Sequence, residues 1–269
     1  MRRLLILALA ALVTACGGAG IGPPSSRSPW NPSATLAPLE QPSHRCGSPN
    51  GHAEAFRFKT HDGVTLDGAV VGSGTVGVVL AHQYPADLCG WWPYAVYLAR
   101  HGFLVLLFDF RCFGISECPS DHRRWDLTQD LQAATDQLRG LGARSVSLMG
   151  ASLGGAAVLV AGAMITPPVQ SIVELSGEPD LGNIGDPIEA GRAVHDLRLP
   201  VLFVVARDDT AVTVGETRTM FRNTPSNDKH LVVLPSTAGH GWTVLTNGLT
   251  HWSAMAGRVA GFVRAHAGD

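Results

Sequence analysis

The chain has 269 residues, of which 45% are hydrophobic, and its formal net charge is −2. A near-neutral chain without a basic cluster gives no reason to expect binding to nucleic acid. Beyond the N-terminus, no apolar run indicates a membrane span. Length and composition therefore suit one mixed domain that follows an N-terminal leader.

The first sixteen residues have the pattern of an export signal. Arg2 and Arg3 give a positive start, and the apolar run over residues 4–13 is too short for a membrane-spanning helix, which needs about 20 residues. The segment Val13-Thr14-Ala15-Cys16 resembles a bacterial lipobox. We therefore expect a signal peptide over residues 1–15 and a membrane anchor on a lipidated Cys16. An ordinary secretory signal that is cut elsewhere is the alternative.

The segment after Cys16 is rich in proline, serine and glycine and shows no apolar period. Residues 16–45 are therefore predicted to form an extended, semi-stiff tether. Residues 46–269 are predicted to form a single folded domain.

Four cysteines remain once Cys16 is set aside, and an even number in an exported protein suggests disulfides. Four cysteines allow three pairings. One of these joins Cys112 to Cys118 in a short local loop and Cys46 to Cys89, which would fix the end of the tether to the domain. Free thiols are the alternative, and the cysteine spacings match no common zinc pattern.

Within the domain, predicted strands alternate with predicted helices, which is typical of a mostly parallel sheet with helices on both faces. The first two strands form a hairpin around Asp62-Gly63, and later strands are continuous apolar runs. The predicted strands are 55–59, 64–71, 76–81, 103–108, 145–149, 171–175, 201–206 and 230–234. The predicted helices are 91–101, 126–141, 152–165, 215–221 and 251–266.

The motif Gly150-Ala151-Ser152-Leu153-Gly154 lies between a predicted buried strand and a predicted helix. Glycine is 31 of the 269 residues, so a Gly-x-Ser-x-Gly pattern alone is a weak signal. A strand, this turn and a helix together are the pattern of a nucleophile elbow. Ser152 would then lie at a helix N-terminus, where free N–H groups favour developing negative charge. A structural serine in a tight turn is the alternative.

Two further polar segments follow later predicted strands: Ala206-Arg207-Asp208-Asp209-Thr210 and Ala238-Gly239-His240-Gly241-Trp242. The chain order of a serine, an acid and a histidine is that of α/β-hydrolases. In open α/β sheets, ligands bind beyond the carboxyl ends of the strands, so the three segments are expected at one edge of the sheet.

Over about residues 55–266 the chain resembles the α/β-hydrolase superfamily, and most of all its small carboxylesterases and dienelactone-hydrolase-like proteins. The resemblance implies a Ser152, Asp209 and His240 triad in a serine hydrolase that cleaves carboxylic esters through an acyl-enzyme. The spacing Ala206-x-x-Asp209-x-x-Val212 is similar to the family's Gly-x-x-Asp-x-x-Val and favours Asp209 over Asp208. Glu174 and Asp180 are weaker candidates for the acid.

The resemblance also assigns roles to the loops around the elbow. The oxyanion hole would use the N–H of Leu153 and, after the strand over 76–81, the N–H of Tyr84, although Gln83 stands where the family often has glycine. His82 is expected to hold this loop by a hydrogen bond. Asp109 and Arg111 are expected to form a structural ion pair in a segment where Cys112 replaces the family's usual glycine.

The aromatic residues near these loops have two readings. Trp91 and Trp92 either pack in the core or line a pocket, and core packing is favoured because aromatic side chains are mostly buried for their area. Trp242, beside His240, is the better candidate for the rim of a pocket.

The 25 residues between the strands at 171–175 and 201–206 leave room for a minimal cap domain or none. No metal and no organic cofactor is implied, and the expected partners are a small ester or acyl substrate and, through the lipid anchor, a membrane. Two alternatives remain: an exported peptidase or amidase on the same fold, and a non-catalytic binding lipoprotein.

Overall fold

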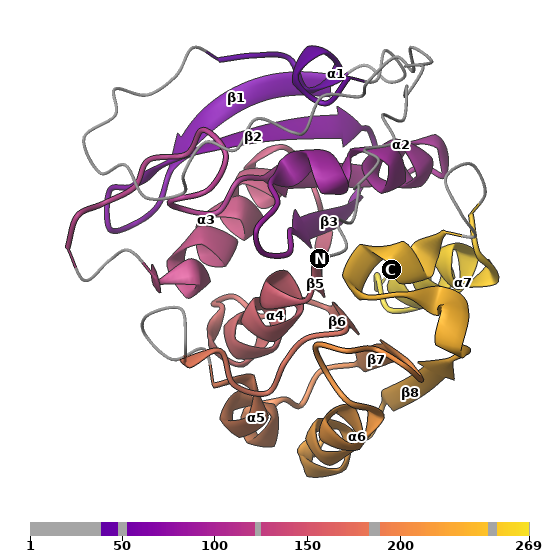
Figure 1. The fold of residues 1–269 in the computed structure, drawn as a ribbon. Helices are drawn as coiled ribbons and strands as arrows, with labels where there is room; N and C mark the ends of the chain where they lie inside the picture. Colours follow the sequence, from indigo (N-terminus) through magenta and orange to yellow (C-terminus); the bar gives the residue numbers. More distant parts are fainter. Residues whose placement is uncertain (1–38, 48–52, 122–124, 183–188, 247–251, 269) are drawn as a thin grey trace, which may run out of the picture.

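The computed structural model describes residues 39–47, 53–121, 125–182, 189–246 and 252–268 (Figure 1). Cys16, the predicted signal peptide and most of the predicted tether lie outside the described residues. None of the described helices has the length and apolarity to cross a membrane.

Eight strands form one sheet in the order β1-β2-β4-β3-β5-β6-β7-β8. Only β2 is antiparallel to its neighbours, β1 and β4, and the remaining pairs are parallel. The predicted eight-stranded, mostly parallel sheet is therefore confirmed. The bounds are β1 Ala53–Lys59, β2 Thr65–Gly72, β3 Val76–Ala81, β4 Leu104–Phe108, β5 Ser145–Ala151, β6 Ser171–Leu175, β7 Val201–Ala206 and β8 Lys229–Leu234.

Helices cover both faces of the sheet, as predicted (Figure 1). The helix α2 and the helix α7 pack on one face, and α3, α4 and α6 pack on the other. Their bounds are α2 Trp92–Arg100, α3 Leu127–Gly140, α4 Leu153–Met164, α6 Val214–Asn223 and α7 Ala254–Ala265. Short pieces that the sequence pattern did not indicate are α1 Pro42–Arg45, α5 Ala190–Ala193, η1 Leu88–Gly90, η4 Val194–Asp196, η5 Ser236–Ala238 and η6 Gly241–Leu245.

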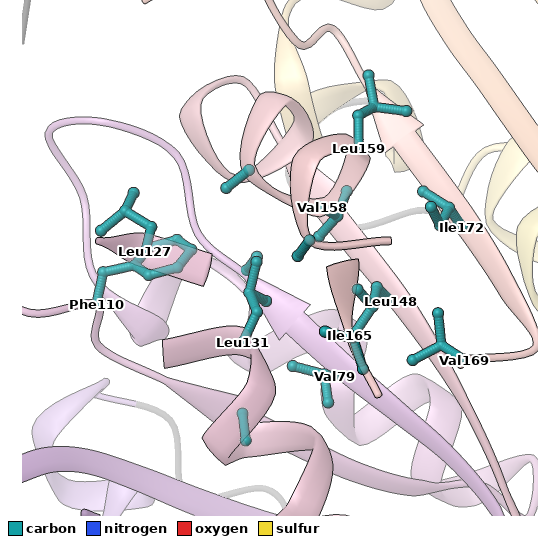
Figure 2. Close-up of a cluster of buried hydrophobic side chains, with 14 of the residues drawn as sticks. Val79, Phe110, Leu127, Leu131, Leu148, Val158, Leu159, Ile165, Val169 and Ile172 are labelled. Carbon is teal, nitrogen blue, oxygen red and sulfur yellow. The ribbon is translucent and has the colours of Figure 1, made fainter. Parts of the chain in front are cut away.

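The core lies in two layers because successive residues of a strand point to opposite faces of the sheet. Val79 and Leu148 pack beneath α3 and α4, as Figure 2 shows, together with Leu131 and Val158. The neighbouring strand residues belong to the other layer, under α2 and α7. Full burial on both faces explains why β3 to β7 read as apolar runs rather than as alternating patterns.

The direction in which successive strands are added to the sheet reverses at β3. The chain moves outward from β3 to β4 and then returns to the other side of β3 to form β5. Ala81, the last residue of β3, pairs with Gly150 near the end of β5. The loops that follow β3 and β5 therefore leave the sheet side by side, where open α/β sheets bind ligands.

Two disulfides join Cys46 to Cys89 and Cys112 to Cys118. Cys112 has a φ of 67°, in the left-handed region that glycine adopts most easily. A left-handed residue is thus what this turn requires, in agreement with the glycine of the related motif.

The predicted ion pair between Asp109 and Arg111 is wrong, because each residue has other partners. The Arg111 guanidinium, fully buried, pairs with Asp130 at 2.7 Å and with Asp62 at 2.8 Å. The Asp109 carboxylate pairs with Arg45 at 2.7 Å. Both residues are buried, and the fold supplies their counter-charges from segments distant in the sequence.

Candidate active site

Ser152 lies at a sharp turn between β5 and α4. Its φ of 51° is unusual for a residue other than glycine, and its N–H donates a hydrogen bond of 2.9 Å to the Leu175 carbonyl. Such a conformation costs about 1–3 kcal/mol and is characteristic of functional sites. Ser152 as a whole is 6% exposed. The strand, the sharp turn and the helix that the sequence predicts around Ser152 are therefore all present.

Glycines allow this turn to approach the end of β3. A Cβ atom on Gly154 would lie 2.2 Å from the Ala81 carbonyl oxygen, and one on Gly150 would lie 2.0 Å from the Gly154 oxygen. Contacts that short do not occur without movement of the backbone. The two glycines of the motif thus bring the turn at Ser152 against the loop that follows β3.

The N-terminus of α4 offers backbone donors beside Ser152. In the described part of the chain, the N–H groups of Leu153 and Tyr84 take part in no hydrogen bond. The helix has an apolar composition, and its dipole favours negative charge at this end. Leu153 follows Ser152 directly, and Tyr84, on the loop after β3, is 44% exposed.

Asp209 and His240 are joined directly. Both carboxylate oxygens of Asp209 lie 2.9 Å from the Nδ1 of His240, and the Asp209 side chain is fully buried. The Asp209 carboxylate also accepts hydrogen bonds from the N–H groups of Ala211 and Val212. These bonds fix the carboxylate in a turn after β7 and orient the imidazole ring.

The competing acids have other environments. Asp208 is exposed to solvent. Asp180 is also exposed and accepts the N–H of Gly182. Glu174 accepts the N–H of Gly177 after β6. Among the four acids named from the sequence, Asp209 is the one that holds His240.

The loop that carries His240 contacts both the loop after β3 and the end of β5 beside Ser152. A Cβ atom on Gly241, whose φ is 59°, would lie 2.1 Å from the Gln83 Oε1 and 3.4 Å from the Ala151 Cβ. The segment therefore needs glycine at this position both for its conformation and for its packing.

These contacts place the neighbours of His240, of Ser152 and of Tyr84 against one another. The imidazole is 28% exposed. With a proton on Nδ1 for the bond to Asp209, its Nε2 is an acceptor. Within the described residues, no hydrogen bond joins Ser152 to His240; such bonds often tighten only when substrate binds.

His82 has a structural role, as expected. Its ring is fully buried, its Nε2 accepts the N–H of Phe110, and its Nδ1 lies 3.0 Å from the Gln83 carbonyl. Burial lowers the pKa of His82 to about 4, so the ring is neutral at physiological pH. It links the loop after β3 to the segment after β4.

Trp91 and Trp92 belong to the core, as the sequence favours, whereas Trp242 is more exposed. Trp91 and Trp92 are buried in the core, and the Trp91 indole donates to the Ala81 carbonyl at 2.8 Å. Trp242 is half-buried, and its ring lies 5.6 Å from the Trp91 ring. A Cβ atom on Gly90 would lie 2.1 Å from Trp242, so this side chain joins the loop of His240 to η1.

Two further carboxyl groups, those of the buried Glu174 and the half-buried Glu178, lie close enough to the Asp209–His240 pair to sense its charges. Burial, together with the nearby charges of Glu178 and Asp209, raises the pKa of Glu174 to about 8, although the hydrogen bond from Gly177 acts to lower it. Burial also raises the pKa of Glu178, which lies close enough to His240 and Asp209 to sense their charges. Each has one oxygen without a hydrogen-bond partner. From the sequence, Glu174 is only a weaker candidate for the acid, and no sequence signal distinguishes Glu178.

Glu174→Gln is expected to change the pH dependence of stability. Since the pKa of Glu174 in the folded state is about 8, the carboxyl keeps its proton up to about that pH, whereas the unfolded chain releases it near the ordinary glutamate pKa of 4.5. The contribution of the Glu174 carboxyl to the free energy of unfolding is therefore fully present below about pH 4.5 and is lost as the pH rises to 8. Glutamine does not ionise, so the slope of the unfolding free energy should differ from the wild-type slope by about 1.4 kcal/mol per pH unit.

Urea unfolding at a series of pH values between 5.5 and 7.5 measures this slope. Glu189→Gln removes the same chemical group from an exposed position and is the matched control. Parallel stability curves for Glu174→Gln and the wild type would show that the buried carboxyl is ionised throughout this range.

Among the residues that the structure describes, no group of three or more histidine, cysteine or acidic side chains is placed to hold a metal ion.

The comparisons with known proteins agree with this architecture. A family model for the alpha/beta hydrolase fold matches residues 77–194, which include the elbow and the loop after β3. An uncharacterised protein of Escherichia coli, YfhR, is 30% identical over 115 residues, and the match spans about 40% of each chain. The chain therefore covers about two fifths of the length of this curated relative.

Two solved structures have a similar fold over most of the chain. The Pyrococcus furiosus esterase Pf2001 superposes with a TM-score of 0.72 at 18% identity and covers 87% of this chain and 97% of its own. A dienelactone hydrolase from Anabaena variabilis superposes with a TM-score of 0.62 at 24% identity and covers 80% of this chain and 98% of its own. The chain thus has the α/β-hydrolase fold.

Proposed function

We propose that the protein is a serine hydrolase that cleaves carboxylic esters through Ser152, Asp209 and His240. The observation that carries the proposal is the pair of 2.9 Å contacts between the Asp209 carboxylate and the His240 Nδ1. The loop of this histidine packs against the turn at Ser152, and a binding scaffold has no physical need for all three residues.

The reaction would proceed by acyl transfer. The Nε2 of His240 takes the proton of the Ser152 hydroxyl as the oxygen attacks the ester carbonyl. The N–H groups of Leu153 and Tyr84 stabilise the oxyanion, at about 3 kcal/mol per donor. The protonated His240 then gives its proton to the departing alkoxide. Water, deprotonated by His240, then attacks the acyl-enzyme. The bond between the acyl carbon and the Ser152 oxygen breaks, the acid leaves, and His240 returns the proton to Ser152.

An ester substrate is favoured by the similar structures, whose names are those of an esterase and a dienelactone hydrolase. A peptidase or amidase on the same fold would use the same triad but would also need groups that bind a peptide backbone or terminus. The ester reaction is therefore the proposal, and the amide reaction is an outcome of its test.

We also propose that the protein is exported and anchored to the cell envelope by a lipid on Cys16. The two disulfides support export, because disulfides persist in oxidising compartments. Mass spectrometry of the membrane fraction tests this proposal, which fails if the N-terminal peptide begins at another residue or carries no lipid.

A fluorophosphonate probe and a series of p-nitrophenyl esters of rising acyl length test the enzymatic proposal. The wild type should be labelled and should turn over short esters. Ser152→Ala should lose the label and at least about 10⁴-fold of kcat. Ser236→Ala removes an exposed hydroxyl in η5, near His240 in the chain, and is the matched control.

The outcomes separate the three functions. Labelling with turnover of esters supports the esterase. Labelling of Ser152 without ester turnover would favour amides or peptides as substrates. No labelling of a folded wild-type protein would contradict the enzyme and favour a binding protein.

A further inference from the structure

Arg45 connects the N-terminal segment to the interior of the domain. It is the last residue of α1, in the region predicted as tether, and its side chain is only 10% exposed. Its guanidinium lies 2.7 Å from Asp109, 2.9 Å from Asp87 and 3.1 Å from Asp67. Asp109 is fully buried and Asp67 nearly so. One cation from outside the predicted domain thus faces three of its carboxylates.

Two of these carboxylates hold η1, the short helix that ends the loop carrying Tyr84. Asp87 accepts the N–H of Cys89 at 2.9 Å and so caps η1. Asp109 accepts the N–H of Leu88, also at 2.9 Å. Arg45 contacts the second oxygen of each carboxylate and therefore fixes the two groups on which the position of η1 depends.

A disulfide also joins the N-terminal segment to η1. Cys46, the residue after Arg45, forms a disulfide with Cys89 of η1. On its other side, η1 packs through Gly90 against Trp242, two residues beyond His240. The helix η1 is therefore held between the N-terminal segment and the loop of His240. A displacement of η1 would reach Tyr84 through the loop and His240 through Trp242.

We propose that Arg45 is a positioning residue, which through Asp87 and Asp109 holds η1 and so keeps the N–H of Tyr84 where the oxyanion develops. This inference rests on the proposed ester hydrolysis for its catalytic consequence. Its structural part, the attachment of η1 by Arg45, can be measured without any activity.

The test compares the full-chain variants Arg45→Met, Arg45→Lys and Arg57→Met by ester kinetics and by hydrogen exchange. The Arg57 guanidinium lies 3.8 Å from Asp67, so Arg57→Met removes a cation from the same cluster and is the matched control. The amides of Leu88 and Cys89 are the reporters, because they donate to the two carboxylates that Arg45 holds.

Arg45→Met should lower kcat at least about ten-fold with a change in KM of less than about three-fold, since small misplacements of catalytic donors act mainly on the transition state. Arg45→Lys should recover most of kcat, and Arg57→Met should stay within about two-fold of the wild type. In Arg45→Met the Leu88 and Cys89 amides should exchange about ten-fold faster, while amides of α4 keep the wild-type rate.

A folded Arg45→Met variant with wild-type kcat and wild-type exchange would overturn the proposal, and so would an equal loss of kcat in Arg57→Met. If the wild type itself does not hydrolyse esters, the proposed function fails, and the exchange of the two amides alone decides whether Arg45 holds η1.

If Arg45→Met does not fold, Asp87→Asn tests instead whether the ion pair with Arg45 holds η1. Asp87 is 36% exposed, and asparagine keeps an oxygen for the N–H of Cys89 while it loses the charge that faces Arg45. We expect kcat to fall about three-fold or more and the Leu88 amide to exchange faster. Wild-type values for both would overturn the proposal.

Discussion

Asp209→Asn is expected to lower kcat by about 10⁴-fold without unfolding the protein. The carboxylate accepts the Nδ1–H of His240 at 2.9 Å, and in the proposed mechanism this bond leaves Nε2 free to accept the proton of Ser152. Asparagine can present its N–H₂ to Nδ1 instead, which places the imidazole proton on Nε2 and removes the base. Steady-state kinetics with the best p-nitrophenyl ester measure the loss, and circular dichroism checks the fold.

Asp208→Asn is the matched control, because it makes the same change one residue earlier on an exposed side chain. It should leave kcat within about two-fold of the wild type. Full activity in Asp209→Asn would show that another acid supports His240. Glu178, whose carboxyl lies near both residues, would then be the next residue to replace.

The sequence predicts the sheet well because the physical signals are local. The strands β3 to β7 are buried on both faces and read as apolar runs bounded by turns. The hairpin of β1 and β2 carries an Asp-Gly turn, and its register pairs Lys59 with Thr65 across that turn. Helix ends shift by one to three residues, since capping rather than hydrophobic pattern decides them.

The elements missed by the sequence analysis are short. The helices α1 and α5 have four residues each, and η1 has three. A segment of that length has no hydrophobic period, and it forms only because its neighbours hold it. For α1 the holding contacts are the Arg45 ion pairs and the Cys46–Cys89 bond.

The candidate site was predictable where its residues follow strands. Ser152 directly follows β5, Asp209 lies in the loop after β7, and His240 lies in the loop after β8. The parallel sheet brings the segments after these strands to one edge. The partners of buried charges were not predictable in this way. Arg111 is two residues from Asp109, but a neighbour in sequence is not a neighbour in space at the end of a strand. The fold instead pairs Arg111 with Asp130 of α3.

Asp130→Ala is expected to lower the free energy of unfolding by about 3–5 kcal/mol, because it leaves a buried cation without its main partner. Arg111 and Asp130 are both fully buried. The Asp130 carboxylate accepts the Arg111 Nε–H at 2.7 Å and the Arg111 backbone N–H at 2.9 Å. Asp62, which is 21% exposed, contacts the far side of the guanidinium and cannot replace these two bonds.

Asp136→Ala in the same helix separates this effect from the helix propensity of alanine. Asp136 is 36% exposed and pairs with Arg139 at 3.7 Å on the surface, where such pairs contribute about 0–1 kcal/mol. Urea unfolding of both variants gives the comparison. If the two losses differed by less than about 1 kcal/mol, solvent would have to reach the buried guanidinium and replace the lost carboxylate. A difference of several kcal/mol would show that the segment after β4, which carries both Arg111 and the Asp109 that holds η1, depends on a counter-charge supplied by α3.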